Sequence, residues 1–161
     1  MTKLLISYYT ETNSTLEVCD YIKSKLDDYD VTTMPLTDSK DLAAYSIVIL
    51  AAPVHGMRWH QKAYDFLERN QESLKGKKVV YIALASMAYQ GRHFWQKKVY
   101  NVLNKPSKLV KPNETAIFGG VSGDMPNLLR FVFGISKDAK KDQRDWQMID
   151  EWIANLRKQI G

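Results

Sequence analysis

The stretch Ile47-Val48-Ile49-Leu50-Ala51-Ala52 contains no polar side chain, and Val79-Val80-Tyr81-Ile82 is similarly apolar. A strand with one face in solvent alternates polar and apolar residues, whereas a parallel strand covered by helices on both faces is apolar throughout. Residues 47–52 and 78–85 therefore predict two buried parallel strands. Three further runs rich in β-branched residues predict the remaining strands: residues 3–8, 31–36 and 115–119.

Helical patterns separate the predicted strands. Apolar residues recur at helical spacing in four segments: residues 16–26, 63–67, 95–103 and 146–160. The link between the second and third strands has room only for a short helix over residues 40–45, and residues 119–143 follow no regular pattern. Strands that alternate with helices predict an α/β fold, with right-handed crossovers and helices on both faces of a parallel sheet.

Length and composition indicate an ordinary globular protein. The 161 residues suit one domain over residues 1–161, and 45% hydrophobic with 25% charged residues excludes a disordered or fibrous chain. The single cysteine, Cys19, falls in an apolar helical pattern, so we expect a small core residue in a cytoplasmic, reducing setting. The apolar runs are too short for an export signal or a membrane-spanning helix, and we expect neither.

The charge of the chain favours anionic partners. The formal net charge is +5 and the isoelectric point is near 9.2. Such a charge attracts an acidic protein, a phospholipid surface, nucleic acid or a negatively charged substrate. Simple solubility explains it equally well.

The loop after the first predicted strand carries four hydroxyl groups in six residues: Thr10, Glu11, Thr12, Asn13, Ser14 and Thr15. A helix start presents unpaired N–H groups and the positive end of the helix dipole, so the loop suits a phosphate. The alternative is that Asn13, Ser14 or Thr15 only caps the helix. The chain has neither a Walker-type lysine nor GxGxxG spacing here, which argues against a nucleoside triphosphatase and a nicotinamide Rossmann site.

The same loop resembles the phosphate loop of the flavodoxin family, Thr/Ser-x-Thr-Gly-x-Thr, with Thr10, Thr12 and Thr15 at matching positions. Asn13 replaces the usual glycine, and asparagine tolerates a positive φ better than most residues. The resemblance implies a flavodoxin-like three-layer sandwich with a five-stranded parallel sheet of order 2-1-3-4-5. It also implies flavin mononucleotide (FMN) as cofactor, with its phosphate in this loop.

Two further loops are expected beside the first, because ligands of such sheets bind beyond the carboxyl ends of the strands. In a flavodoxin these loops flank the flat flavin ring. We assign the loop after the third strand to the cofactor site: Pro53, Val54, His55, Gly56, Met57 and Arg58. We also assign the loop after the fourth strand: Ser86, Met87, Ala88, Tyr89, Gln90 and Gly91. Tyr89 is the expected stacking partner, whereas His55 taken alone is better explained as a loop residue bonded to backbone.

Within the flavodoxin-like group the resemblance is strongest to the menaquinone-dependent protoporphyrinogen oxidase type. Four stretches carry it: Pro53-Val54-His55-Gly56, Ala63-Tyr64-Asp65-Phe66, Gly119-Gly120 and Asp145-Trp146. It implies an FMN oxidoreductase that passes electrons from an organic substrate to a quinone. The alternatives are an electron carrier, which the positive charge disfavours because such carriers are strongly acidic, and a flavodoxin fold that has lost FMN.

No residue stands out for protein-side catalysis, and no metal ligands cluster in the sequence. As partners we expect a redox protein or a quinone, together with a small-molecule substrate, and no nucleic acid. An apolar segment followed by lysines, residues 125–141, suits peripheral contact with the inner face of an anionic membrane. The alternative, which we adopt, is that its large apolar side chains pack against the rim of the domain: Leu128, Leu129, Phe131 and Phe133.

Overall fold

The computed structural model describes residues 1–39, 41–86 and 91–161. Five parallel strands form its central sheet: β1 (Thr2–Tyr8), β2 (Tyr29–Pro35), β3 (Ile47–His55), β5 (Lys78–Leu84) and β6 (Glu114–Phe118). Their order is β2-β1-β3-β5-β6, and a two-residue strand, β4 (Arg58–Trp59), pairs antiparallel with β3. The predicted α/β class and the predicted strand order, 2-1-3-4-5 along the main strands, are therefore confirmed.

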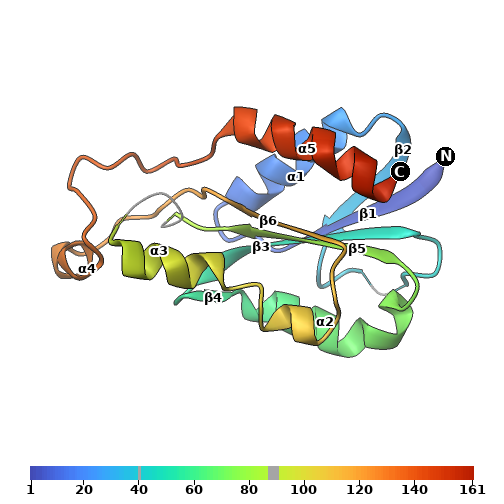
Figure 1. Ribbon diagram of the computed structural model, residues 1–161, viewed down its shortest axis with the longest axis horizontal. Coiled ribbons are helices and arrows are strands. Elements are labelled where there is room, and N and C mark those ends of the chain that lie inside the picture. Colours follow the sequence, from blue (N-terminus) through green and yellow to red (C-terminus); the bar gives the residue numbers. More distant parts are fainter. Residues whose placement is uncertain (40, 87–90) are drawn as a thin grey trace.

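Helices cover both faces of the sheet (Figure 1). On one face lie α1 (Ser14–Lys25) and α5 (Trp146–Ile160), and on the other lie α2 (Gln61–Leu74), α3 (His93–Tyr100) and a short 3-10 helix, η1 (Pro106–Lys108). A seven-residue helix, α4 (Asn127–Phe133), stands apart from both layers, beyond the carboxyl ends of the strands. The cofactor site was expected at that end of the sheet.

The unbroken apolar run in β3 is explained by burial on both faces. Successive side chains of a strand point to opposite sides. Ile47 and Ile49 pack with apolar residues of α1 and α5, whereas Val48 and Leu50 pack with those of α2. All side chains from Ile47 to Ala52 are at most 1% exposed, so neither face tolerates a polar residue.

Three local predictions differ from the structure. The short helix predicted over residues 40–45 is wrong for the described residues 41–45, which form a turn. The Asp41 carboxylate accepts a hydrogen bond from the Ala43 N–H at 2.9 Å, and such side-chain bonds compete with a helix. The pattern over residues 95–103 predicted a longer helix than α3, which ends at Tyr100, and α4 lies within residues 119–143, where no regular pattern was found.

Within the described ranges, no helix has both the length and the apolar composition needed to cross a membrane.

The amino-terminal cap of α5 provides a test of the helix layer. The Asp145 carboxylate accepts a hydrogen bond from the Met148 N–H at 3.0 Å, at the start of a helix whose apolar stripe is fully buried. We expect Asp145→Ala to lower the free energy of unfolding by about 1 kcal/mol. Asp145→Asn is the matched control, because asparagine caps equally well. Urea denaturation followed by circular dichroism measures both, and equal stability of the two variants would contradict the assignment.

Candidate functional site

The carboxyl ends of four strands meet at one edge of the sheet and surround an open cleft of about 550 Å³. Residues from all three predicted loops line it. The first loop contributes Glu11, Thr12, Ser14 and Thr15. The second and third contribute Pro53, Val54, His55, Gly56, Met57 and Ser86. The structure therefore brings together loops that are far apart in the sequence.

The first loop joins β1 to α1 through a left-handed residue. Asn13 has φ 63°, a left-handed conformation that favours glycine. Asparagine adopts this conformation more readily than most other residues, which explains why it can replace the glycine here. Its side chain makes no capping hydrogen bond, and Ser14 and Thr15 already lie inside the helix. The alternative that these residues serve only as caps therefore finds no support in the hydrogen bonds.

Two hydroxyl groups of this loop are buried without a partner. Thr10 Oγ1 and Thr15 Oγ1 make no hydrogen bond to any described residue, and Thr15 is only 1% exposed. Thr33 Oγ1 and Trp152 Nε1 are in the same state elsewhere in the described chain. An unsatisfied buried hydroxyl costs about 1–3 kcal/mol. Two of them beside the positive end of α1 make a donor set that a bound phosphate would satisfy.

The second loop is a tight hairpin between β3 and β4. Its two turn residues, Gly56 and Met57, have φ 54° and 60°, as a type I′ turn requires. Glycine adopts this conformation freely, whereas in Met57 the left-handed conformation costs roughly 1–2 kcal/mol. The hairpin is anchored by buried Trp59, whose Nε1–H donates to the Ala52 carbonyl at 3.1 Å. A rigid strand thus holds a strained turn at the wall of the cleft.

Arg58 faces away from this cleft. Its guanidinium lies 5.8 Å from the centroid of the Tyr64 ring and lines a second groove on the other side of the hairpin. Thr10 and Asn13 also do not line the cleft, although they shape the phosphate loop. Gly91, with φ 83°, ends the third loop away from the cleft wall. Four predicted residues of that loop lie outside the described residues: Met87, Ala88, Tyr89 and Gln90.

The loop after β6 was not assigned to the site, yet residues 120–126 line the cleft. A Cβ on Gly120 would lie 3.4 Å from the backbone nitrogens of Ala85 and Ser86, so this glycine lets the loop pass close to the end of β5. The rule that ligands bind at strand ends already pointed to this loop. The apolar and basic composition of residues 125–141 led instead to two other interpretations, contact with a membrane and packing against the rim of the domain.

The helix α4 forms the outer wall of the cleft. Leu129 and Phe133, one turn apart, line the cleft, and Phe133 packs edge-on against Trp95 with ring centroids 5.1 Å apart. The expectation that the whole segment packs against the rim is wrong for Leu128 and Phe131, which are 72% and 74% exposed. So short a helix can turn only one face to the domain, and these two residues lie on the other.

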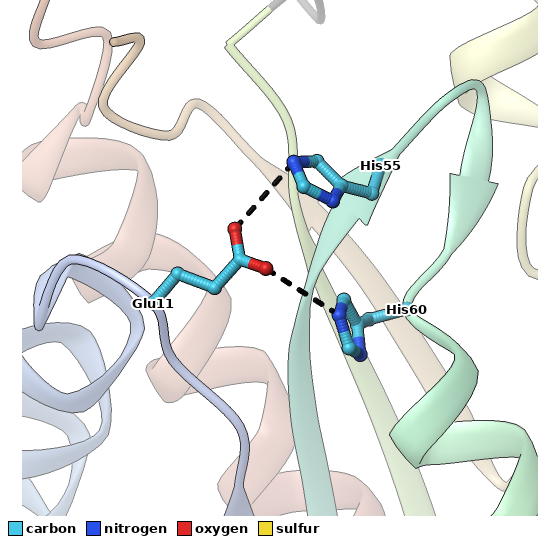
Figure 2. Close-up of side chains that lie close together, drawn as sticks. All are labelled: Glu11, His55 and His60. Carbon is cyan, nitrogen blue, oxygen red and sulfur yellow. Dashed lines mark ion pairs between the residues drawn. The ribbon is translucent and has the colours of Figure 1, made fainter.

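A cluster of one carboxylate and two imidazoles joins the first loop to the second loop and to the start of α2. Glu11 reaches toward His55 and His60, which point back at it (Figure 2), with Oε2 3.5 Å from His55 Nε2 and Oε1 3.6 Å from His60 Nε2. The His60 ring stacks on Tyr9 at a centroid distance of 4.0 Å. Burial lowers the pKa of His60, and the Glu11 carboxylate opposes this shift. Sequence patterns did not predict this cluster, because its members lie on different elements.

Comparison with known proteins agrees with this architecture. A family model described as Flavodoxin domain matches residues 5–145. No curated protein matches the chain. Oxidised flavodoxin 1 from Bacillus cereus is 16% identical with a TM-score of 0.62, over 99% of this chain and 100% of that chain.

Two other solved structures are similar. Fusobacterium nucleatum flavodoxin bound to flavin mononucleotide is 18% identical with a TM-score of 0.58, over 100% of both chains. An apo NADH:FMN oxidoreductase is 13% identical with a TM-score of 0.64, over 100% of this chain and 91% of that chain. At these low identities the structural similarity shows the fold alone, whereas the family match spans residues 5–145, most of the sequence. The chain therefore belongs to the flavodoxin-domain family.

Proposed function

We propose that the cleft binds FMN and that the protein is an FMN-dependent oxidoreductase. The observation that carries this proposal is a pair of buried, unpartnered hydroxyls in the phosphate loop: Thr15 Oγ1, which belongs to the first turn of α1 and to the cleft wall, and Thr10 Oγ1, which belongs to the beginning of the same loop. A dianionic phosphate would accept hydrogen bonds from both, as well as from the free N–H groups of the helix. The similar Fusobacterium nucleatum structure contains flavin mononucleotide, which supports the choice of ligand.

The rest of the cleft suits a flat and largely apolar ring. Pro53, Val54 and Met57 form one wall, and Leu129 and Phe133 of α4 form another. Apolar walls with a few polar groups are usual for cofactor sites. When bound, FMN would supply the transfer of one or two electrons, while the protein controls access and the polarity of the surroundings.

A basic groove next to the hairpin indicates the class of substrate. Its volume is about 660 Å³, and four cationic side chains line it: Arg58, Lys97, Lys98 and Lys105. None of the four forms an ion pair with a carboxylate of the described residues. Arg58 and Lys105 each lie 5.8 Å from the centroid of the Tyr64 ring, and Lys98 lies 4.7 Å from that of Phe94.

Unpaired cations beside aromatic rings suit a substrate that carries carboxylates on a large apolar skeleton. We therefore propose activity of the protoporphyrinogen oxidase type, with a quinone as electron acceptor. An electron carrier that docks on other redox proteins is the alternative, and the net charge of +5 counts against it if its partners are basic.

Peripheral contact with a membrane would give access to a quinone. The outward face of α4 exposes Leu128, Phe131 and Val132, and the Arg92 guanidinium lies 5.9 Å from the centroid of the Phe131 ring. Exposed apolar residues next to cations suit an anionic lipid surface. We propose this face as the membrane-facing side of the protein.

The phosphate loop is tested by removing its unpartnered hydroxyls. Thr10→Val and Thr15→Val should each weaken FMN binding about 10- to 100-fold, because each removes a hydrogen bond to a charged phosphate. Neither should destabilise the cofactor-free protein, since each hydroxyl lacks a partner there. Quenching of FMN fluorescence gives the affinity, and thermal unfolding gives the stability.

Thr33→Val is the matched control for these variants, because Thr33 Oγ1 is also buried and unpartnered but lies on β2, outside the loop. Its FMN affinity should equal that of the unmodified protein. A protein that does not quench FMN fluorescence, or loop variants with unchanged affinity, would refute the proposed cofactor site.

The basic groove is tested by turnover of protoporphyrinogen with a quinone acceptor. Lys97→Gln and Lys105→Gln should each raise KM about tenfold with kcat little changed, because each removes a charge that binds substrate but takes no part in the reaction. Lys158→Gln, on α5 at the opposite face, is the control and should leave KM unchanged. Turnover only with a flavodoxin reductase as electron donor would favour the electron carrier instead.

A further inference from the structure

Three side chains from separate elements converge beside the cleft, and two of them, Glu11 and His55, line it. Glu11 belongs to the phosphate loop, His55 ends β3, and His60 immediately precedes α2. One ligand atom from each lies within 4.8 Å of the other two, and Figure 2 shows both imidazoles facing the Glu11 carboxylate. We propose that they bind a divalent first-row transition metal, with Zn²⁺ as the representative ion.

The distances suit such an ion. Zn²⁺ lies about 2.0–2.2 Å from imidazole nitrogen and carboxylate oxygen, so neighbouring ligand atoms of a tetrahedral site lie about 3.4 Å apart. The observed separations between the Glu11 oxygens and the two histidine nitrogens are 3.5 and 3.6 Å. The two separations involve different oxygens of the carboxylate, and one ligand atom from each residue lies within 4.8 Å of the others, so rotation of the side chains is needed to bring three ligand atoms to one ion.

The ligand types indicate the class of metal. Two imidazoles and one carboxylate favour Zn²⁺ and its neighbours over Mg²⁺ and Ca²⁺, which prefer oxygen ligands throughout. Three protein ligands leave a fourth position for water. The side chains of His55 and Glu11 are 66% and 41% exposed, so both the ion and that water can reach the site.

His60 is already oriented to bind a metal ion, but binding would break one hydrogen bond that it makes. Its ring is fixed by stacking on Tyr9, and its Nε2 already faces Glu11. Its Nδ1 accepts a hydrogen bond from the Lys62 N–H at 3.2 Å, which caps α2. A metal on Nε2 moves the ring proton to Nδ1 and breaks this cap. The loss of a cap costs about 1 kcal/mol, which coordination of the ion by the imidazole has to exceed.

The bound metal would join two walls of the cleft. Glu11 lies on the phosphate loop, whereas His55 and His60 flank the hairpin, so one ion would restrain both loops. We therefore expect Zn²⁺ to slow the release of FMN. This consequence rests on the proposed function, but metal binding itself does not.

Calorimetric titration of the purified protein with ZnCl₂ at neutral pH tests the site, both before and after saturation with FMN. We expect one ion per chain, and at least about tenfold weaker binding in Glu11→Gln and His55→Ala. His93→Ala is the matched control, because His93 is the remaining histidine of the chain and lies outside the cluster. Its affinity for Zn²⁺ should be unchanged.

His60→Asn separates loss of a ligand from loss of the fold. Asparagine caps helices well, so this variant should keep the thermal stability of α2 while its Zn²⁺ affinity falls. In the unmodified protein, Zn²⁺ should also shift the amide resonance of Lys62 as the cap breaks. Absence of binding, or binding that Glu11→Gln and His55→Ala leave intact, would overturn the metal site. Metal binding without FMN binding would instead refute only the proposed function.

Discussion

Burial of β3 on both faces is the constraint on which the rest of the structure depends. Ile47 and Ile49 pack under α1 and α5, while Val48 and Leu50 pack over α2. Such a strand needs a parallel neighbour on each side and a helical layer above and below. Because β1, β3 and β5 run in the same direction, their carboxyl ends share one edge. The loops that form the cleft meet there as a direct consequence.

That rigid frame allows the loops to hold conformations that are unfavourable by themselves. Asn13 and Met57 are the positive-φ residues other than glycine in the described chain, and they lie in the first and second loops. The unpartnered hydroxyls of Thr10 and Thr15 add a second cost. Strain and unsatisfied groups gathered at one edge are expected where a ligand supplies the missing interactions. Without a ligand, burial of the apolar core offsets the free-energy cost of the strained residues and the unpartnered hydroxyls.

The sequence predicted the elements whose residues form a regular local pattern. Continuous apolar runs identified β3 and β5, and helical spacing identified α5. The turn at Asp41 was missed because a side-chain hydrogen bond there replaces a helix that composition alone allows. The split of α4 into a cleft-facing Leu129 and an exposed Phe131 depends on the path of the loop after β6. The contact of Glu11 with His60 was equally hidden, because it exists only after distant segments have packed.

The hairpin between β3 and β4 separates the proposed cofactor cleft from the basic groove proposed for the substrate. Gly56 and Met57 line both the cleft and the basic groove, so a single two-residue turn separates the two spaces. A substrate held by Lys97 and Lys105 would therefore lie against the same turn that walls the cofactor cleft. The left-handed backbone of this turn keeps the wall thin, because a wider loop would push the groove away from the cleft. In the proposed arrangement the strain at Met57 would be the cost of placing the substrate close to the cofactor, and Trp59, anchored in the core, would keep that geometry in place.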